Sequence, residues 1–204
     1  LWSRGLGDVY KRQLVSRMAL TMPPPMFHDM VRATASWPDL CRRLISTSAT
    51  LSHARSRKLV ALGLAHMLRH ASAQDKGLLS AVPDMIGMWT EVVGEVVEDE
   101  AGSAERYERE LSPTRALEIG EDGIPFLDEF GLIEAAPTPS SARTDAVRSR
   151  DPSFNVPLRA YVADTLNAVL QNGSYKTQLQ SLLATIDPLV LDTLQRGLSE
   201  RPVA

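Results

Sequence analysis

Apolar residues recur at spacings of three and four along most of the chain, which is the periodicity of amphipathic helices. The clearest stripe covers residues 78–97 and holds Pro83 either in its first turn or at a kink. Its members are Leu78, Leu79, Val82, Met85, Ile86, Trp89, Val92, Val93, Val96 and Val97. The segment before it, 54–70, is apolar on nearly all sides at its centre. It therefore predicts an interior helix that is covered on more than one face.

Helix boundaries are marked by proline and by capping residues in the first half of the chain. Residues 23–25 are three prolines, which end any preceding helix because proline lacks the amide hydrogen. The run Ser36-Trp37-Pro38-Asp39 predicts a helix start, with proline and an acidic residue in the first turn. Helices separated by such short breaks indicate antiparallel pairs. Pairs that recur about every 40–47 residues would be HEAT-type repeats.

Helical periodicity returns at residue 151 and predicts three short amphipathic helices. The first begins near Pro157 and is closed by Gly173, and the third begins at Asp187-Pro188. Their apolar stripes are Leu158, Tyr161, Val162, Thr165, Leu166, Val169 and Leu170; Leu179, Leu182, Leu183 and Ile186; and Leu191, Leu194 and Leu198. Helices this short cannot bury their stripes alone, so we expect them to cap a larger helical body.

The segment 99–150 differs in composition from both flanks, because it is rich in acidic residues and contains the low-complexity run 137–141. Two small apolar clusters, 124–127 and 130–133, lie within it. They fit either a surface loop with a few docked residues or a short binding or autoinhibitory segment. The sequence predicts helical pairs over 14–98, a partly disordered acidic linker over 99–150 and a three-helix cap over 151–204.

The first thirteen residues are interpreted as an artefact. Ser3–Gln13 reads SRGLGDVYKRQ, which looks like a translated transposase adapter from a sequencing library. Such scars are excluded from arguments about fold. We therefore expect residues 14–204 to be the C-terminal fragment of a longer protein.

Composition and charge narrow the class of partner. A hydrophobic content of 44% excludes global disorder, and only 5% aromatic residues favours helices over sheets. The net charge of −3 makes the chain a poor ligand for phosphate backbones. The apolar run 59–68 is about half as long as a membrane span. We therefore expect protein partners, especially basic ones, and neither a membrane nor a nucleic acid.

No motif in the sequence carries catalytic chemistry. It has no glycine-rich phosphate loop, HExxH, CxxC or GxSxG motif. We therefore expect no enzyme activity, with no catalytic residues, no cofactor and no metal site. The histidines His28, His53, His66 and His70 lack the cysteine or acidic partners of a metal site, although the spacing of His66 and His70 places both on one helix face.

Three further features have a structural and a functional interpretation. Cys41, the only cysteine, follows the apolar side of its helix and is predicted to lie in the core; its neighbours Arg42 and Arg43 offer the alternative of a reactive thiolate. A lone cysteine also favours a reducing compartment. Trp89 is predicted to be a core residue rather than an exposed anchor.

Arg55, Arg57 and Lys58 form a small basic patch. It is predicted to be a solvated helix end, with the alternative that it holds an acidic partner or the acidic linker. The sequence assigns no residue to cargo binding.

Several segments carry a resemblance to a known family: 150–152 with Val156, Leu158 and Tyr161, then 179–182, 185–187 and 194–198, and upstream 57–64 and 78–97. These segments resemble the C-terminal end of importin eleven-type nuclear transport receptors, in the importin-β (karyopherin) superfamily.

The resemblance implies a HEAT-repeat solenoid that carries cargo proteins through the nuclear pore and shuttles between cytoplasm and nucleus. It also implies release of cargo by RanGTP, and it assigns RanGTP and nucleoporins to repeats upstream of this chain. Two alternatives stay open. One is a helical-repeat adaptor or scaffold without Ran dependence, and the other is a helical enzyme domain whose catalytic residues lie upstream.

Overall fold

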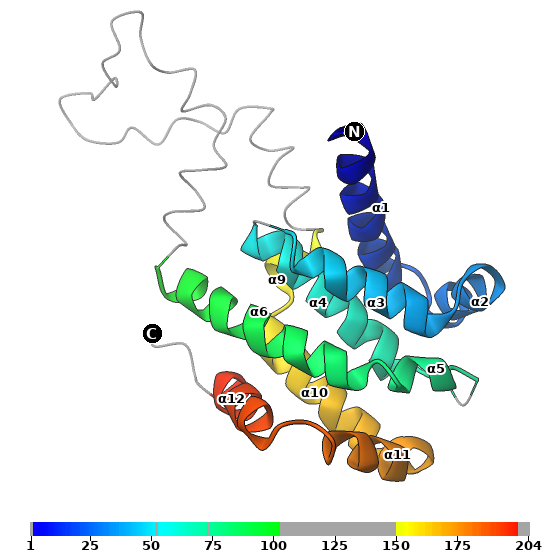
Figure 1. Ribbon diagram of the computed structural model, residues 1–204, viewed down its shortest axis with the longest axis vertical. Coiled ribbons are helices and arrows are strands. Elements are labelled where there is room, and N and C mark those ends of the chain that lie inside the picture. The colour runs from blue at the N-terminus through cyan, green and yellow to red at the C-terminus, as the bar shows by residue number, and fades with distance from the viewer. Residues whose placement is uncertain (1, 52, 73, 103–149, 200–204) are drawn as a thin grey trace, which may run out of the picture.

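The computed structural model describes residues 2–51, 53–72, 74–102 and 150–199, and all regular structure in these ranges is helical (Figure 1). The all-α prediction is therefore confirmed. The helices are α1 (Trp2–Thr21), α2 (Pro24–Thr34), α3 (Trp37–Ser48), α4 (Ala54–Arg69), α5 (Lys76–Leu79), α6 (Val82–Gly102), α9 (Pro152–Asn155), α10 (Leu158–Gln171), α11 (Gly173–Leu183) and α12 (Pro188–Ser199).

Two of the helix starts predicted from capping residues are confirmed. Ser36 precedes α3, and its hydroxyl oxygen accepts a hydrogen bond from the backbone N–H of Asp39 at 3.3 Å. Asp187 precedes α12, and its carboxylate accepts from the backbone N–H of Leu189 at 2.8 Å. Each cap satisfies an amide that has no partner within the first turn of its helix.

Two other boundaries differ from the sequence prediction. The stripe 78–97 is shared by two helices, since α5 ends at Leu79 and α6 begins at Val82. The break is a consequence of Pro83, which has no N–H to donate to the carbonyl of Leu79. Helix α10 ends before Gly173, as predicted, but Gly173 does not lie in a loop between two helices. Asn172 is the C-cap of α10, in extended backbone, and Gly173 is already the first residue of α11.

Helix α4 lies at the centre of the molecule and packs against α1, α3, α6, α9 and α10. Every side chain of its middle section, Leu59–Ala65, is buried, which confirms the predicted interior helix. Helix α1 crosses α4 very closely at Gly63. A Cβ atom there would lie 2.9 Å from Cβ and 3.0 Å from Cα of Ser16, so only glycine permits this crossing.

The C-terminal helices pack directly on the earlier ones. Helix α10 lies along α4, and α11 and α12 lie against α6. The α12–α6 contact is also close, because a Cβ atom at Gly197 would lie 2.9 Å from Cγ1 of Val93. The buried residues of both parts, from Ala19 to Leu194, form one hydrophobic cluster.

Two sequence predictions concern the linker and the N-terminal segment. The linker clusters 124–127 and 130–133 lie outside the described residues. The segment interpreted as adapter sequence, Ser3–Gln13, lies within α1, and its interpretation as an artefact stays a prediction.

Candidate functional site

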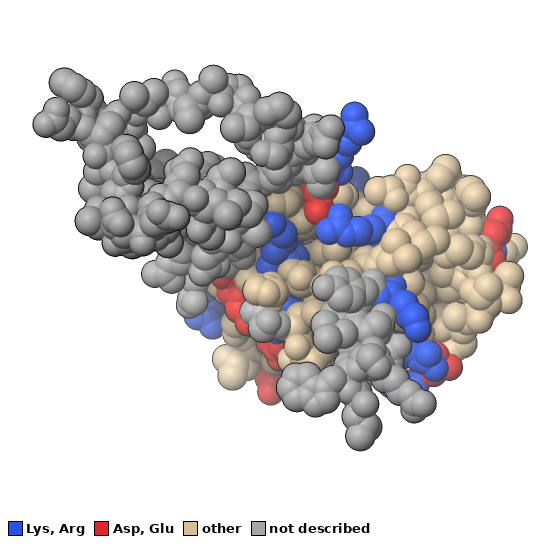
Figure 2. Space-filling view, turned by 90° about the horizontal axis from the view of Figure 1, so that it is seen from above, with Lys and Arg blue, Asp and Glu red and all other residues tan. Residues whose placement is uncertain are grey.

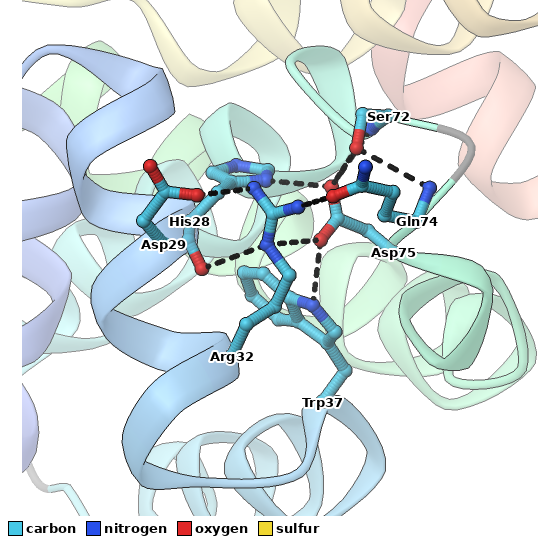
Figure 3. Close-up of polar contacts among 7 residues, drawn as sticks. All are labelled: His28, Asp29, Arg32, Trp37, Ser72, Gln74 and Asp75. Atoms are coloured by element: carbon cyan, nitrogen blue, oxygen red, sulfur yellow. Dashed lines mark hydrogen bonds and ion pairs between the residues drawn. The ribbon is translucent and has the colours of Figure 1, made fainter.

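The largest polar cluster surrounds Asp75, which lies in the turn between α4 and α5 and has no exposed surface (Figure 3). Its carboxylate accepts hydrogen bonds from Nδ1 of His28 on α2 at 3.0 Å and from Nε1 of Trp37 on α3 at 2.9 Å. It also accepts from the backbone N–H and the hydroxyl of Ser72, at 2.9 and 2.7 Å. The guanidinium of Arg32 lies 3.6 Å away. Asp75 thus joins α2, α3 and the α4–α5 turn.

Hydrogen bonding keeps this buried carboxyl ionised. Burial alone raises the pKa of Asp75, but the hydrogen bonds from His28, Ser72 and Trp37 outweigh it and hold the pKa below its ordinary value. Because a carboxylate only accepts, Nδ1 of His28 must donate. The sequence identified no partner for His28, and the structure places one carboxylate beside it. Its partner is 47 residues away, and no sequence signal marked Asp75.

Arg32 closes the cluster on its solvent side. It donates to the side-chain oxygen of Gln74, to Asp29 at 2.8 Å and to the backbone carbonyl of His28 at 3.3 Å (Figure 3). The arrangement fixes helices and offers no open ligand position. In the part of the chain that the structure describes, no group of three or more His, Cys, Asp or Glu side chains is placed to hold a metal ion.

A second histidine cluster joins α4 to α10. Nδ1 of His66 lies 2.5 Å from the hydroxyl oxygen of Tyr161. The rings of His66 and His70 are 4.5 Å apart, which confirms that they share a helix face. The guanidinium of Arg69 lies 5.5 Å from the centre of the Tyr161 ring. Burial, then the charges of His70, His28 and Arg69, lower the pKa of His66 to about 4. His53 stands apart, exposed just before α4.

Cys41 and Trp89 are core residues, as predicted. Cys41 is fully buried, and burial raises the pKa of its thiol to about 12, which is incompatible with a reactive thiolate at neutral pH. Trp89 is fully buried as well, and its indole N–H donates to the carbonyl of Ala61 at 3.2 Å.

The basic patch at the start of α4 is not a solvated helix end, so that prediction is wrong. Arg57 forms ion pairs with Glu91, at 3.0 Å, and with Glu95, both on α6. The guanidinium of Arg55 lies 3.5 Å from the centre of the Phe154 ring on α9, and Lys58 is buried. Helices α6 and α9, which pack against α4, place acidic and aromatic side chains beside these cations. Residue spacing alone does not predict these contacts.

A further ion pair ties α9 to α1. Arg17 donates to Asp151 at 2.8 Å, and Asp151 also caps α9 by accepting from the backbone N–H and the hydroxyl of Ser153. Burial raises the pKa of Asp151, but the bonds from Ser153 and Arg17 outweigh it and lower that pKa. The two residues are 134 positions apart, so this contact fixes the C-terminal helices on the N-terminal ones.

Among the described residues, large apolar side chains are exposed on α1 and α2, on α9, where Phe154 lies, and on α12. Leu14 on α1 is 56% exposed and Met26 on α2 is 61% exposed, with the half-buried Met18, Met22 and Met30 on the same two helices or their junction. Figure 2 shows Lys and Arg side chains over the middle of one face, whereas the surface toward the α2 end is largely uncharged. Leu189, 67% exposed, lies on α12.

The net negative charge of the chain does not come from the described helices. Residues 103–149 contain ten acidic and five basic residues, a net of −5. The rest of the chain contains fifteen acidic and seventeen basic residues, a net of +2. An electrostatic attraction for basic proteins would therefore come from 103–149 and not from the helical body.

Comparison with known proteins gave one match. A family model described as Importin-11-like, TPR repeats, matches residues 11–199. No curated protein and no solved structure matches the chain. The prediction of an all-α helical-repeat fold is confirmed; the family description names TPR repeats where the sequence suggested HEAT-type ones, and both consist of stacked helix pairs. Within the described residues, no helix is long and apolar enough to span a membrane.

Proposed function

The chain belongs to the family of importin-11-like helical repeats, and on this basis we propose that it is part of a nuclear import receptor. In this proposal the receptor binds cargo proteins and carries them through the nuclear pore in a Ran-dependent cycle. The observation that carries the proposal is the family match, which extends over nearly all of the described helices. Transport by such a receptor requires binding and release, so the proposal assigns no catalytic residue and no cofactor.

The proposal places this chain at the C-terminal end of the receptor. Two exposed apolar side chains, Leu14 on α1 and Met26 on α2, support further repeats before α1. The C-terminal placement itself rests on the resemblance of residues 150–198 to the end of such receptors, because Leu189 on α12 is exposed as well. In helical-repeat proteins, terminal repeats have a polar outer face, whereas inner repeats bury an apolar face against their neighbours. A further helix pair packed on α1 and α2 would cover these side chains. RanGTP and nucleoporins are then assigned to the preceding repeats.

An adaptor or scaffold without Ran dependence is the alternative. One observation favours it: α4 is covered by five other helices, so the body has a core of its own. Such a body can present a binding surface without any further repeats.

Ran binding separates the two proposals. The complete gene product would be titrated with Ran loaded with GTP and, in parallel, with Ran loaded with GDP. A receptor binds the GTP form preferentially and enters nuclei of permeabilised cells. Equal or absent binding of the two forms, together with exclusion from the nuclei, would overturn the receptor proposal in favour of the adaptor.

The position within the receptor has its own test. Leu14→Glu and Met26→Glu would be made in the complete gene product and in the 204-residue chain, with Leu189→Glu as the equally exposed control. We expect the first two substitutions to lower the unfolding midpoint only in the complete product, because only there would a preceding helix pair bury the introduced charge. An equal, small effect in both proteins would exclude a buried interface at this surface.

A further inference from the structure

We propose that the contact between α4 and α10 is a pH-sensitive joint, in which protonation of His66 releases α10 from α4 while the rest of the helical body stays folded. This inference goes beyond the proposed transport function and does not depend on it.

The geometry of the joint accommodates only a neutral His66 ring. A single hydrogen lies between Nδ1 of His66 and the hydroxyl oxygen of Tyr161, which are 2.5 Å apart. In the neutral ring Nδ1 carries the hydrogen and donates to the Tyr161 hydroxyl, because the other tautomer would place an N–H at Nε2. The other ring nitrogen, Nε2, is buried and has no hydrogen-bond partner among the described residues. Protonation puts a hydrogen on both nitrogens, and the N–H at Nε2 is then buried without an acceptor, which is unfavourable.

The groups that face His66 add to this cost. Arg69 and His70 lie on its own helix, Tyr161 lies on α10, and His28 faces it from α2. None of these four groups is a carboxylate. The buried carboxylate of Asp75 is already engaged by His28, Trp37 and Ser72.

The groups that shift the pKa of His66 include no carboxylate from α1, α3, α6 or α9, the other helices packed on α4. Helix α11, which packs on α10, adds none either. Its Tyr175 has a buried hydroxyl without a partner in the described chain, and burial, then the charge of Asp75, raise the pKa of this hydroxyl. A charged His66 would therefore lie beside Arg69 and His70 with no negative group of its own.

The direction of the pH effect follows from these contacts. When α10 is docked, burial and the neighbouring charges hold the pKa of His66 at about 4, and when α10 is released the ring has its ordinary value near 6.5. Between these two pH values the released state binds more protons, so docking weakens as the pH falls.

The carboxylates elsewhere resist this acidification. The pKa values of Asp75 and Asp151 both lie below 3.8, so the contacts they make persist in the same window. Acidification therefore acts on the His66–Tyr161 contact before it acts on the Asp75 cluster or on the Arg17–Asp151 pair.

Hydrogen exchange followed by mass spectrometry tests the proposal on the complete 204-residue chain. Exchange would be measured at pH 7.5 and 5.0 and corrected for the intrinsic pH dependence of amide exchange. We expect exchange of residues 158–171 to rise about tenfold at pH 5.0 relative to residues 37–48, after allowance for the partial exposure of His66. His66→Gln preserves a hydrogen-bonding side chain that does not titrate, and should abolish this rise. His53→Gln, at an exposed position, should leave it intact.

Several outcomes would overturn the proposal of a pH-sensitive joint. Uniform acceleration in all helices at pH 5.0 would indicate global loosening, and a rise that persists in His66→Gln would assign the effect to another group. If circular dichroism shows that His66→Gln is unfolded at pH 7.5, His66→Phe replaces it as a non-titrating ring. An NMR titration of the wild-type chain gives an independent check, because a His66 ring that titrates near 6.5 in the docked state would contradict the proposal.

Discussion

Two histidines of this molecule, His28 on α2 and His66 on α4, have different hydrogen-bond partners. His28 and His66 each use Nδ1 in a hydrogen bond, and each has a buried Nε2 without a partner in the described chain. The partner of His28 is the carboxylate of Asp75, whereas the partner of His66 is the hydroxyl of Tyr161. His28 therefore belongs to a cluster that contains a negative charge, whereas His66 lies beside Arg69 and His70.

A buried carboxylate joins more elements of this helical body than a hydroxyl does. Asp75 brings together donors from α2, α3 and its own turn, and stays ionised because those donors outweigh its burial. The hydroxyl of Tyr161 connects only α4 and α10 and supplies no charge. We therefore expect the Asp75 cluster to be the stronger and less pH-sensitive of the two.

Removing the carboxylate should have the largest effect. We expect Asp75→Asn to lower the free energy of unfolding by about 3–5 kcal/mol, because it removes the negative charge beside Arg32 and replaces one accepting oxygen with an NH2 group that faces buried donors. Urea denaturation at pH 7 measures this change. Asp164→Asn, on the exposed side of α10, is the matched control and should change stability by less than about 0.5 kcal/mol. A loss below about 1 kcal/mol in Asp75→Asn would show that the cluster is not the centre we describe.

Removing one donor from the same cluster should cost less. We expect Trp37→Phe to lower the free energy of unfolding by about 2 kcal/mol, through the lost indole hydrogen bond and the smaller ring. In the Asp75→Asn background the same substitution should cost about 1 kcal/mol less, since the charge-assisted bond is already gone. A double-mutant cycle in urea measures this coupling. Strictly additive losses would mean that Trp37 contributes through packing alone.

Acidification should separate the two clusters. The pKa of His66 is lowered on folding, so its contribution to stability is complete above about pH 6.5 and is lost progressively toward pH 4. We expect the wild-type chain to lose about 1 kcal/mol between pH 7 and 5, after allowance for the partial exposure of the ring. His66→Gln should show little loss in urea titrations at the same two pH values. The contribution of Asp75 should be lost only below about pH 3.8.

The smallest effect is expected at Tyr161. Its hydroxyl makes one hydrogen bond to a neutral ring, so Tyr161→Phe should cost about 0.5–1 kcal/mol. Thermal denaturation followed by circular dichroism should show a fall in Tm of about 2–4 °C. A fall as large as that of Trp37→Phe would remove the distinction between the two clusters.

Local features of the fold could be predicted from the sequence because their causes are local. The 3.6-residue period of apolar side chains located the helices, and Ser36 and Asp187 located two of their starts. The apolar composition of 59–65 on every side indicated that α4 lies in the interior. Cys41 and Trp89 were assigned to the core for the same reason, since their position on a helix face is set by residue spacing alone.

The polar contacts of the candidate site could not be predicted in this way. Asp75 lies in a short turn with no periodicity, and its donors His28 and Trp37 are 47 and 38 residues away. The position of Arg57 at a helix start predicts a solvated cation, but in the fold Glu91 and Glu95 of α6 lie beside it.

Apolar periodicity and capping residues are enough to predict that this chain forms amphipathic helices, where several of them begin, and which helix is innermost. Only the tertiary structure decided which polar groups meet. A helix position constrains a side chain to one face, but the partner on that face depends on how closely and at what angle two helices cross. The packing of α10 on α4 sets the environment of His66. The approach of α2 and α3 to the α4–α5 turn sets that of His28.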